Sequence, residues 1–208
     1  MSWFDPSFPS TLLQQAVDAF CRLPGVGRRT ALRMALYLLK QPKEDVEHFG
    51  QAFIRLRHEV KYCRICNMLS DADICPICAD PKRDDSIVCV VESIRDVMSI
   101  EQTGQFRGRY HVLGGIISPI DGVGPNDLSI DALMERLDRG GIAEMLLALS
   151  TTMEGETTAF YLSKRANSYP VRITAIARGV GFGDELESTD ELTLGRAIQN
   201  RQPFNFQI

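Results

Sequence analysis

The sequence has 208 residues, of which 44% are hydrophobic, and a formal net charge of −4. This length permits one large domain or two or three small ones, and the composition is ordinary for a globular protein. No apolar run approaches the ~20 residues that a membrane-spanning helix needs, and residues 1–6 lack the basic and apolar regions of a secretory signal. We therefore expect a cytoplasmic protein without a membrane partner.

The charges are distributed unevenly along the chain. The negative total by itself argues against a nucleic-acid partner, yet residues 19–43 contain six cations and no acid. Residues 183–191 contain five acids and no cation. A chain polarised in this way can bind an anion at one end while its net charge remains negative.

Three amphipathic helices are predicted in the first third of the chain. Apolar residues recur every three or four positions over 10–22, from residue 28 to the residues before Pro42, and over 44–61. Ser10 or Thr11 is expected near the N-cap of the first helix. We expect the three helices to bury a small shared core.

The turn between the first two helices has the sequence LPGVG and precedes a basic helix. Its two glycines permit a tight turn and a close approach of the backbone to a partner. The free N–H groups and the dipole at the start of the second helix suit a phosphate. This pattern resembles a helix-hairpin-helix motif that contacts the DNA backbone, and the alternative is a plain turn with a solvated basic face. The candidate DNA-binding residues are Gly25, Gly27, Arg28, Arg29 and Arg33.

Two Cys-x-x-Cys pairs follow the third helix. Paired thiolates at this spacing can occupy the four vertices of a tetrahedral Zn²⁺ site, and the alternative is two disulfides. We predict one structural zinc ion per chain. Its ligands are Cys63, Cys66, Cys75 and Cys78. The remaining cysteines, Cys21 and Cys89, have apolar neighbours and are predicted to be buried thiols.

The rest of the chain alternates between two patterns. Short apolar runs typical of strands buried on both faces occur at 87–91, 110–113, 144–149 and 171–176. Helical patterns lie between them, near 94–102, 129–139 and 156–167. Strands that alternate with helices predict a mostly parallel α/β sheet.

Carboxylates follow two of the predicted strands, where ligands gather in open α/β sheets. They are Glu92, Glu154 and Glu156. They could hold Mg²⁺, and the layout resembles a Toprim domain, although a Glu-Gly-Glu sequence stands where that family has Asp-x-Asp. The alternative is that these residues cap helices or bind the basic surface of another protein. His111 lies within a predicted strand and is interpreted as a packed or surface histidine rather than a catalytic one.

The order of these motifs resembles the RecR family of bacterial recombination mediators. The resemblance covers roughly residues 10–195 and is most specific at 23–27 and 100–104. It implies an α plus α/β multidomain protein, with a helix-hairpin-helix region at 1–61 and a four-cysteine zinc knuckle at 62–80. A Toprim-like domain at 81–178 and an assembly segment at 179–208 follow.

The resemblance also implies a function. Members of this family are not enzymes; they bind single- and double-stranded DNA at gaps and breaks and assemble as rings, often tetramers. With RecO, and in another route RecF, they load RecA onto DNA coated by single-strand binding protein. Arg29 and Arg33 would contact DNA, and Glu92, Glu154 and Glu156 would contact RecO. Two alternatives are a Mg²⁺-dependent Toprim nuclease or strand-transferase and a zinc-stabilised DNA-binding module that acts alone.

Overall fold

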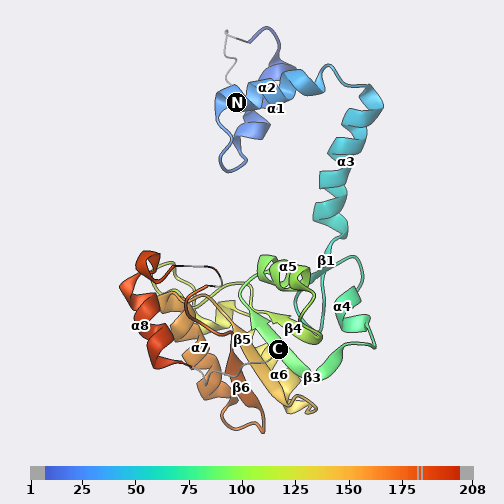
Figure 1. Ribbon diagram of the computed structural model, residues 1–208. Coiled ribbons are helices and arrows are strands. Elements are labelled where there is room, and N and C mark those ends of the chain that lie inside the picture. The colour runs from blue at the N-terminus through green and yellow to red at the C-terminus, as the bar shows by residue number, and fades with distance from the viewer. Residues whose placement is uncertain (1–7, 182, 184, 202–208) are drawn as a thin grey trace. The chain divides into compact units, whose positions relative to one another are not determined.

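The computed structural model describes residues 8–181, 183 and 185–201, which divide into two compact units, residues 1–60 and 61–208 (Figure 1). Asp184 of the acidic segment and the tail 202–208 lie outside the described residues. None of the described helices is long and apolar enough to span a membrane.

The first unit consists of three helices, α1 (Thr11–Cys21), α2 (Arg28–Leu38) and α3 (Lys43–Glu59). Ser10 caps α1, because its Oγ accepts hydrogen bonds from the backbone N–H groups of Leu12 and Leu13 at 3.2 and 3.5 Å. The three predicted helices are therefore present; α1 and α3 lie within two residues of their predicted ends, and α2 ends at Leu38, ahead of Pro42 as predicted.

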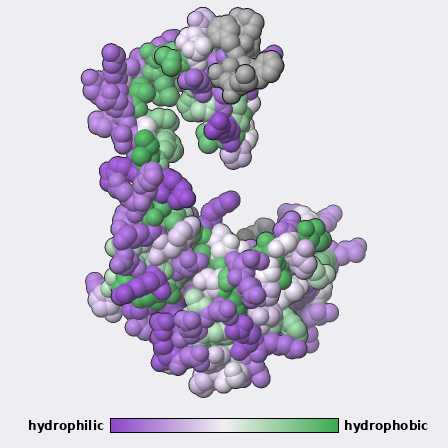
Figure 2. All heavy atoms as spheres, turned by 180° about the vertical axis from the view of Figure 1, so that it is seen from behind, coloured by the Kyte–Doolittle hydropathy of each residue, from purple (hydrophilic) through white to green (hydrophobic). Residues whose placement is uncertain are grey.

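The core of this unit lies between α1 and α2 alone. Val17 of α1 packs on Ala31 and Ala35 of α2, whose small side chains allow the two helices to approach closely. Helix α3 contributes no buried residue. Its aromatic residues Phe49 and Phe53 are 43% and 57% exposed, and apolar side chains are visible on the surface of this unit (Figure 2). The predicted core of three helices is thus wrong for α3.

The burial of Cys21 in this unit also differs from its prediction. Cys21 is exposed, because it lies on the last turn of α1 outside the α1–α2 contact. Cys89, in the second unit, is fully buried as predicted.

The second unit begins with the cysteine knuckle. A short antiparallel pair, β1 (Lys61–Tyr62) and β2 (Leu69–Ser70), is followed by a single helical turn, α4 (Pro76–Ala79). A four-stranded sheet follows in the order β4-β3-β5-β6, and all three strand pairs are parallel. The strands are β3 (Asp84–Val91), β4 (Gly108–Val112), β5 (Glu144–Ala148) and β6 (Arg172–Ala175). The predicted parallel α/β sheet is therefore confirmed.

Alternation along β3 explains why its sequence is a continuous apolar run. Val88 and Val90 point into a core with α6 (Ile130–Asp138) and α7 (Met153–Ala166). Cys89 and Val91 point into a second core with α5 (Ile94–Thr103) and with apolar residues of the knuckle. Both faces of the strand are covered, as in parallel sheets generally. The remaining elements are η1 (Pro125–Asp127), η2 (Leu186–Ser188) and α8 (Glu191–Gln199).

Glu101, in the stretch 100–104 that was most specific to the family, has a structural role. Its carboxylate accepts hydrogen bonds from Arg83 Nη1 at 2.8 Å and from the hydroxyl of Tyr110 at 2.7 Å. The Arg83 guanidinium holds the pKa of Glu101 below its usual value. Gly104 ends the helix at φ +65°, a conformation that favours glycine. This stretch therefore joins the end of α5 to the start of β3 and to β4.

His111 is a packed histidine, 1% exposed. Its Nε2 lies 2.7 Å from the carbonyl oxygen of Ser129, so Nε2 carries the proton, and among the described residues Nδ1 has no hydrogen-bond partner. Burial lowers the pKa of His111 to about 4, well below its ordinary value of about 6.5. The imidazole is therefore neutral in the folded protein at physiological pH.

This neutral histidine predicts a loss of stability in acid. Below about pH 6.5 the unfolded chain binds a proton that the folded chain excludes, so stability falls with pH until the folded pKa is reached. Between about pH 7.5 and about pH 5, the histidine should lower the free energy of unfolding by about 2 kcal/mol. Urea titrations of the wild type and H111Q measure this as a difference between the two proteins, in which effects common to both cancel. Parallel pH profiles would contradict the assignment.

Candidate metal centre and nucleic-acid interface

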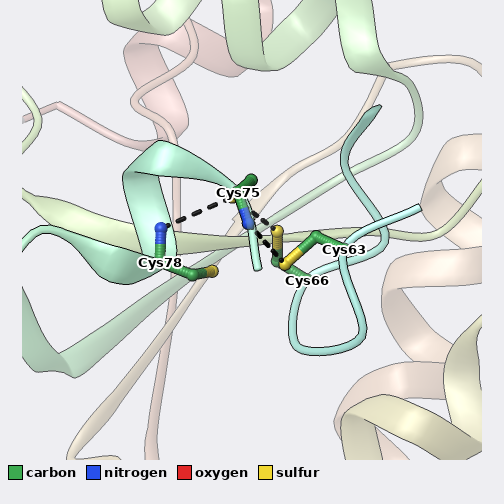
Figure 3. Close-up of side chains that lie close together, drawn as sticks. All are labelled: Cys63, Cys66, Cys75 and Cys78. Carbon is green, nitrogen blue, oxygen red and sulfur yellow. Dashed lines mark hydrogen bonds between the residues drawn. The ribbon is translucent and has the colours of Figure 1, made fainter. Parts of the chain in front are cut away.

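The four knuckle cysteines form a compact cluster of thiols (Figure 3). They are 1–4% exposed, and their sulfur atoms all lie within 4.8 Å of one another. Around a tetrahedral Zn²⁺ with Zn–S bonds of about 2.3 Å, neighbouring sulfurs lie about 3.8 Å apart, and the Sγ atoms of Cys66 and Cys75 are 3.5 Å apart. All four thiols are free, so the alternative of two disulfides is excluded. A buried set of four thiolates with this spacing suits a structural zinc ion.

The local backbone prepares this cluster for a metal. The N–H of Cys75 points to Cys63 Sγ at 3.3 Å, and the N–H of Cys78 points to Cys75 Sγ at 3.4 Å. Burial raises the pKa of Cys63, but the N–H groups around its sulfur, with that of Cys75 foremost, bring the pKa down to about 7. Burial raises the pKa of Cys75 to about 11. Zinc must therefore displace protons from the metal-free cluster.

The knuckle is bound to the sheet through strand β4. The N–H of Val112 donates to the carbonyl of Cys66 at 2.8 Å, and Asn67 Nδ2 donates to the carbonyl of Val112 at 3.0 Å. Asn67 has φ +60°, which turns the chain after the first cysteine pair. Met68 and Ile77 of the knuckle pack into the core on the α5 face of the sheet. Loss of the metal should therefore disturb the sheet as well as the knuckle.

A chelator should remove zinc and lower the melting temperature of the second unit. Zinc affinity should also decrease as the pH falls, because zinc must displace protons from thiols such as Cys75, whose pKa is raised, and a higher proton concentration opposes this displacement. Metal analysis, thermal circular dichroism and hydrogen exchange of β4 peptides measure these effects. The α1–α2 pair serves as an internal control with unchanged exchange. A chelated protein that keeps both its metal and its melting temperature would contradict the zinc assignment.

The predicted DNA-binding turn is a type II β-turn. The N–H of Val26 donates to the carbonyl of Leu23 at 3.2 Å, Pro24 occupies the second position, and Gly25 has φ +78°. A side chain added at Gly27 would meet no described atom of the chain, so internal packing does not require this glycine. Gly27 is the N-cap of α2 without a side-chain cap, and the first turn of α2 has no acid. The helix N-terminus is therefore open to an anion.

The three arginines of this turn differ in their surroundings. Arg28 forms an ion pair with Asp18 at 3.7 Å and lies 5.0 Å from the centre of the Phe8 ring. Arg29 and Arg33 are exposed, and neither side chain has an ion pair or hydrogen bond to a described residue. The two are four residues apart on α2 and share a helix face. The structure thus leaves these two cations available to an external partner.

Glu92 lies at the carboxyl edge of the sheet, directly after β3. Its carboxylate accepts a hydrogen bond from the backbone N–H of Ser150, which follows β5. A cavity of about 540 Å³ opens at this edge, and Glu92, Asp96, Arg178 and Arg196 are among its lining residues. Acidic and basic side chains are therefore mixed at this edge of the sheet.

The other predicted carboxylates lie in the first turn of α7. Glu156 forms an ion pair with Arg178, and neither Glu154 nor Glu156 is among the residues that line this cavity. Gly155 between them is required by packing, because a Cβ there would overlap the backbone of Ser150. Among the described residues, the knuckle cysteines are the only group of three or more Cys, His, Asp or Glu that could hold a metal ion. The structure therefore does not bring Glu92, Glu154 and Glu156 together as one ligand set.

The sequence interpretation missed three residues of this edge: Asp96, Arg178 and Arg196. Asp96 was recognisable, because Ser93 and Asp96 have the spacing of a capping box, and Asp96 Oδ2 accepts hydrogen bonds from the Ser93 N–H at 2.8 Å and from the Ser93 hydroxyl at 2.9 Å. The arginines carried no such signal, since each reaches the edge from an element distant in sequence.

The fold and these sites together define a zinc-containing Toprim protein with an N-terminal helical hairpin. Family models match in the same order: the RecR helix-hairpin-helix at 13–56, the RecR four-cysteine zinc finger at 60–80, Toprim at 86–177 and the RecR C-terminal segment at 179–202. The chain is 58% identical to recombination protein RecR of Bacteroides fragilis, covering 95% of this chain and 96% of that one. It is 58% identical to recombination protein RecR of Porphyromonas gingivalis over 97% of both chains, and 53% identical to that of Flavobacterium psychrophilum over 95% and 96%.

The chain therefore belongs to the RecR family of recombination proteins. Family membership confirms the resemblance drawn from the motifs and places the chain in DNA recombination and repair. It also confirms the zinc-binding character of the four cysteines.

Proposed function

We propose that this chain is a recombination mediator without catalytic activity. It binds single- and double-stranded DNA at gaps and breaks, and it acts with RecO and RecF to load RecA onto DNA coated by single-strand binding protein. The observation that carries this proposal is the match of helix-hairpin-helix, zinc-finger, Toprim and C-terminal RecR models along one chain. Two of the three carboxylates have internal partners, a backbone N–H for Glu92 and Arg178 for Glu156, and this supports a role in binding. Its cellular location would be the cytoplasm, in association with the nucleoid.

The turn at the start of α2 would grip the DNA backbone. Gly25 and Gly27 would let the chain approach a phosphate, and the open N-terminus of α2 would donate N–H groups to it. Arg29 and Arg33 would add two salt-dependent contacts. Arg28 would add a third contact after its ion pair with Asp18 breaks. Such contacts position a protein on DNA without reading its sequence.

Charge reversal tests this grip. The double variant R29E/R33E should lose at least about 100-fold in DNA affinity at about 0.1 M salt, because two attractive phosphate contacts become repulsive. Fluorescence anisotropy across a salt series provides the measurement, and circular dichroism establishes that α1–α3 are intact. The matched control K40E/K43E changes the charge of the same unit equally and should lose only a few-fold. Equal losses of DNA affinity in both variants would show that binding depends on the overall charge of the unit and not on the hairpin.

The Toprim edge and the C-terminal segment would serve assembly and partner contacts. Glu92, Glu154 and Glu156 would attract a basic surface of RecO, and residues 179–208 would support a ring, often a tetramer. Several weak hairpins around one DNA molecule gain affinity through effective concentration. A monomeric variant should therefore bind DNA far more weakly than the assembled protein, even with all of its arginines in place.

One experiment separates this proposal from its alternatives. Purified protein is tested for binding to gapped DNA with and without RecO, in the presence of Mg²⁺. Binding enhanced by RecO without strand cleavage is the expected result. Cleavage that is lost in E92Q would overturn the non-enzymatic assignment. Binding that is indifferent to RecO would favour a module that acts alone.

A further inference from the structure

Arg136 is a buried cation that the sequence analysis did not single out. It lies on α6, and its residue is only 9% exposed. Its Nη1 donates to the carbonyl of Tyr110 at 2.7 Å. Among the described residues no carboxylate lies within ion-pair distance of this guanidinium. A buried charge without an opposite charge is costly, so its compensation has to come from elsewhere.

The place at which Arg136 contacts strand β4 indicates the source of this compensation. One edge of β4 pairs with β3, as the hydrogen bond from the Leu113 N–H to the Val91 carbonyl shows. The opposite edge carries the carbonyl of Tyr110 and both backbone groups of Val112, and the Val112 N–H donates to the carbonyl of Cys66. Two residues of a strand span about 6.6 Å. Arg136 and the first cysteine pair therefore occupy adjacent places on the outer edge of β4.

The negative charge of a zinc-loaded knuckle could balance the positive charge of Arg136. Four thiolates around one Zn²⁺ leave a net charge of about −2 in a site where all four cysteines are buried. The backbone N–H groups of Cys75 and Cys78 donate to the sulfurs of Cys63 and Cys75, and they offset part of this negative charge. Burial lowers the pKa of Arg136, whereas the sulfurs of Cys78 and Cys66, and after them the carboxylate of Asp85, favour its charged form. The cations Lys61 and Arg64 of the knuckle itself are exposed to solvent.

We propose that Arg136 is the counter-cation of the zinc tetrathiolate, supplied to the knuckle by a helix of the Toprim domain. The guanidinium stabilises the deprotonated, metal-bound cysteines, and the anionic site in turn compensates the buried guanidinium. Zinc retention then depends on the folded Toprim core, because α6 holds Arg136 at the edge of β4. The contribution is that of a positioning and charge-balancing residue outside the ligand set, of the kind that tunes metal affinity.

Zinc affinity of the full-length protein tests the proposal. Competition with a chromophoric chelator at fixed pH gives the dissociation constants of the wild type, R136Q, R136K and R139Q. R136Q should bind zinc about 10–100-fold more weakly, as for loss of other outer-shell partners of metal sites. R136K retains the charge and should remain within about threefold of the wild type. R139Q removes an exposed arginine one turn further on and is the matched control.

A second measurement separates charge balance from simple packing. If Arg136 compensates the zinc site, R136Q should lower the stability of the zinc-loaded protein more than that of the chelated protein. Equal losses in both forms would overturn the proposal, as would a zinc affinity of R136Q equal to that of R139Q. Should R136Q fail to fold, R136K decides the matter: retained zinc affinity supports charge balance, and affinity lowered tenfold or more refutes it.

Discussion

The outer edge of strand β4 is the feature on which the second unit depends. An edge strand of a parallel sheet presents N–H and C=O groups that have no partner in the sheet. Here the knuckle pairs with Val112, and Arg136 pairs with the carbonyl of Tyr110. The zinc cluster, the sheet edge and helix α6 are therefore one connected structure. A small knuckle with too few apolar residues for a core of its own gains stability from the metal and from this edge together.

The carboxyl edge of the same sheet is organised differently. In this fold such an edge is a natural place for ligands, and a cavity is present there. However, Glu92 accepts a backbone hydrogen bond from Ser150, and Glu156 pairs with Arg178. These internal partners occupy carboxylates that a metal would need. The arrangement supports the proposal of a surface that contacts another protein. Such a partner can bind a surface of mixed charge, whereas a divalent cation needs several carboxylate ligands.

The first unit leaves the start of α2 and two of its arginines exposed to solvent. Its core consists of the α1–α2 contact, where two alanines of α2 permit close packing, and this leaves the start of α2 open to solvent. Arg29 and Arg33 remain on the exposed face for the same reason, since the opposite face of α2 supplies Ala31 and Ala35 to the core. The face proposed to bind an anion and the face that packs the helices are thus two faces of one helix.

Much of this architecture follows from local sequence patterns. The cysteine spacing predicted the metal cluster, because two tight Cys-x-x-Cys turns bring four sulfurs together in almost any context. Hydrophobic periodicity predicted the helices and the buried strands, since 3.6-residue and continuous apolar patterns suit different packing. The glycine turn before a basic helix likewise depends on a few neighbouring residues, so Gly25, Arg29 and Arg33 could be selected as candidates from sequence.

What the tertiary structure alone decided concerns residues brought together from distant elements. Helix α3 has the periodicity of a core helix yet buries nothing in the described chain, because periodicity shows an apolar face without showing what covers it. The ion pair of Glu156 with Arg178 depends on α7 lying beside the end of β6, and the sequence shows no sign of it. The hydrogen bond from Arg136 to the outer edge of β4, the edge that also meets the knuckle, depends on the strand order that places β4 at the edge of the sheet. Local spacing determines which residues can form a turn or bind a metal, whereas long-range packing determines which charges meet.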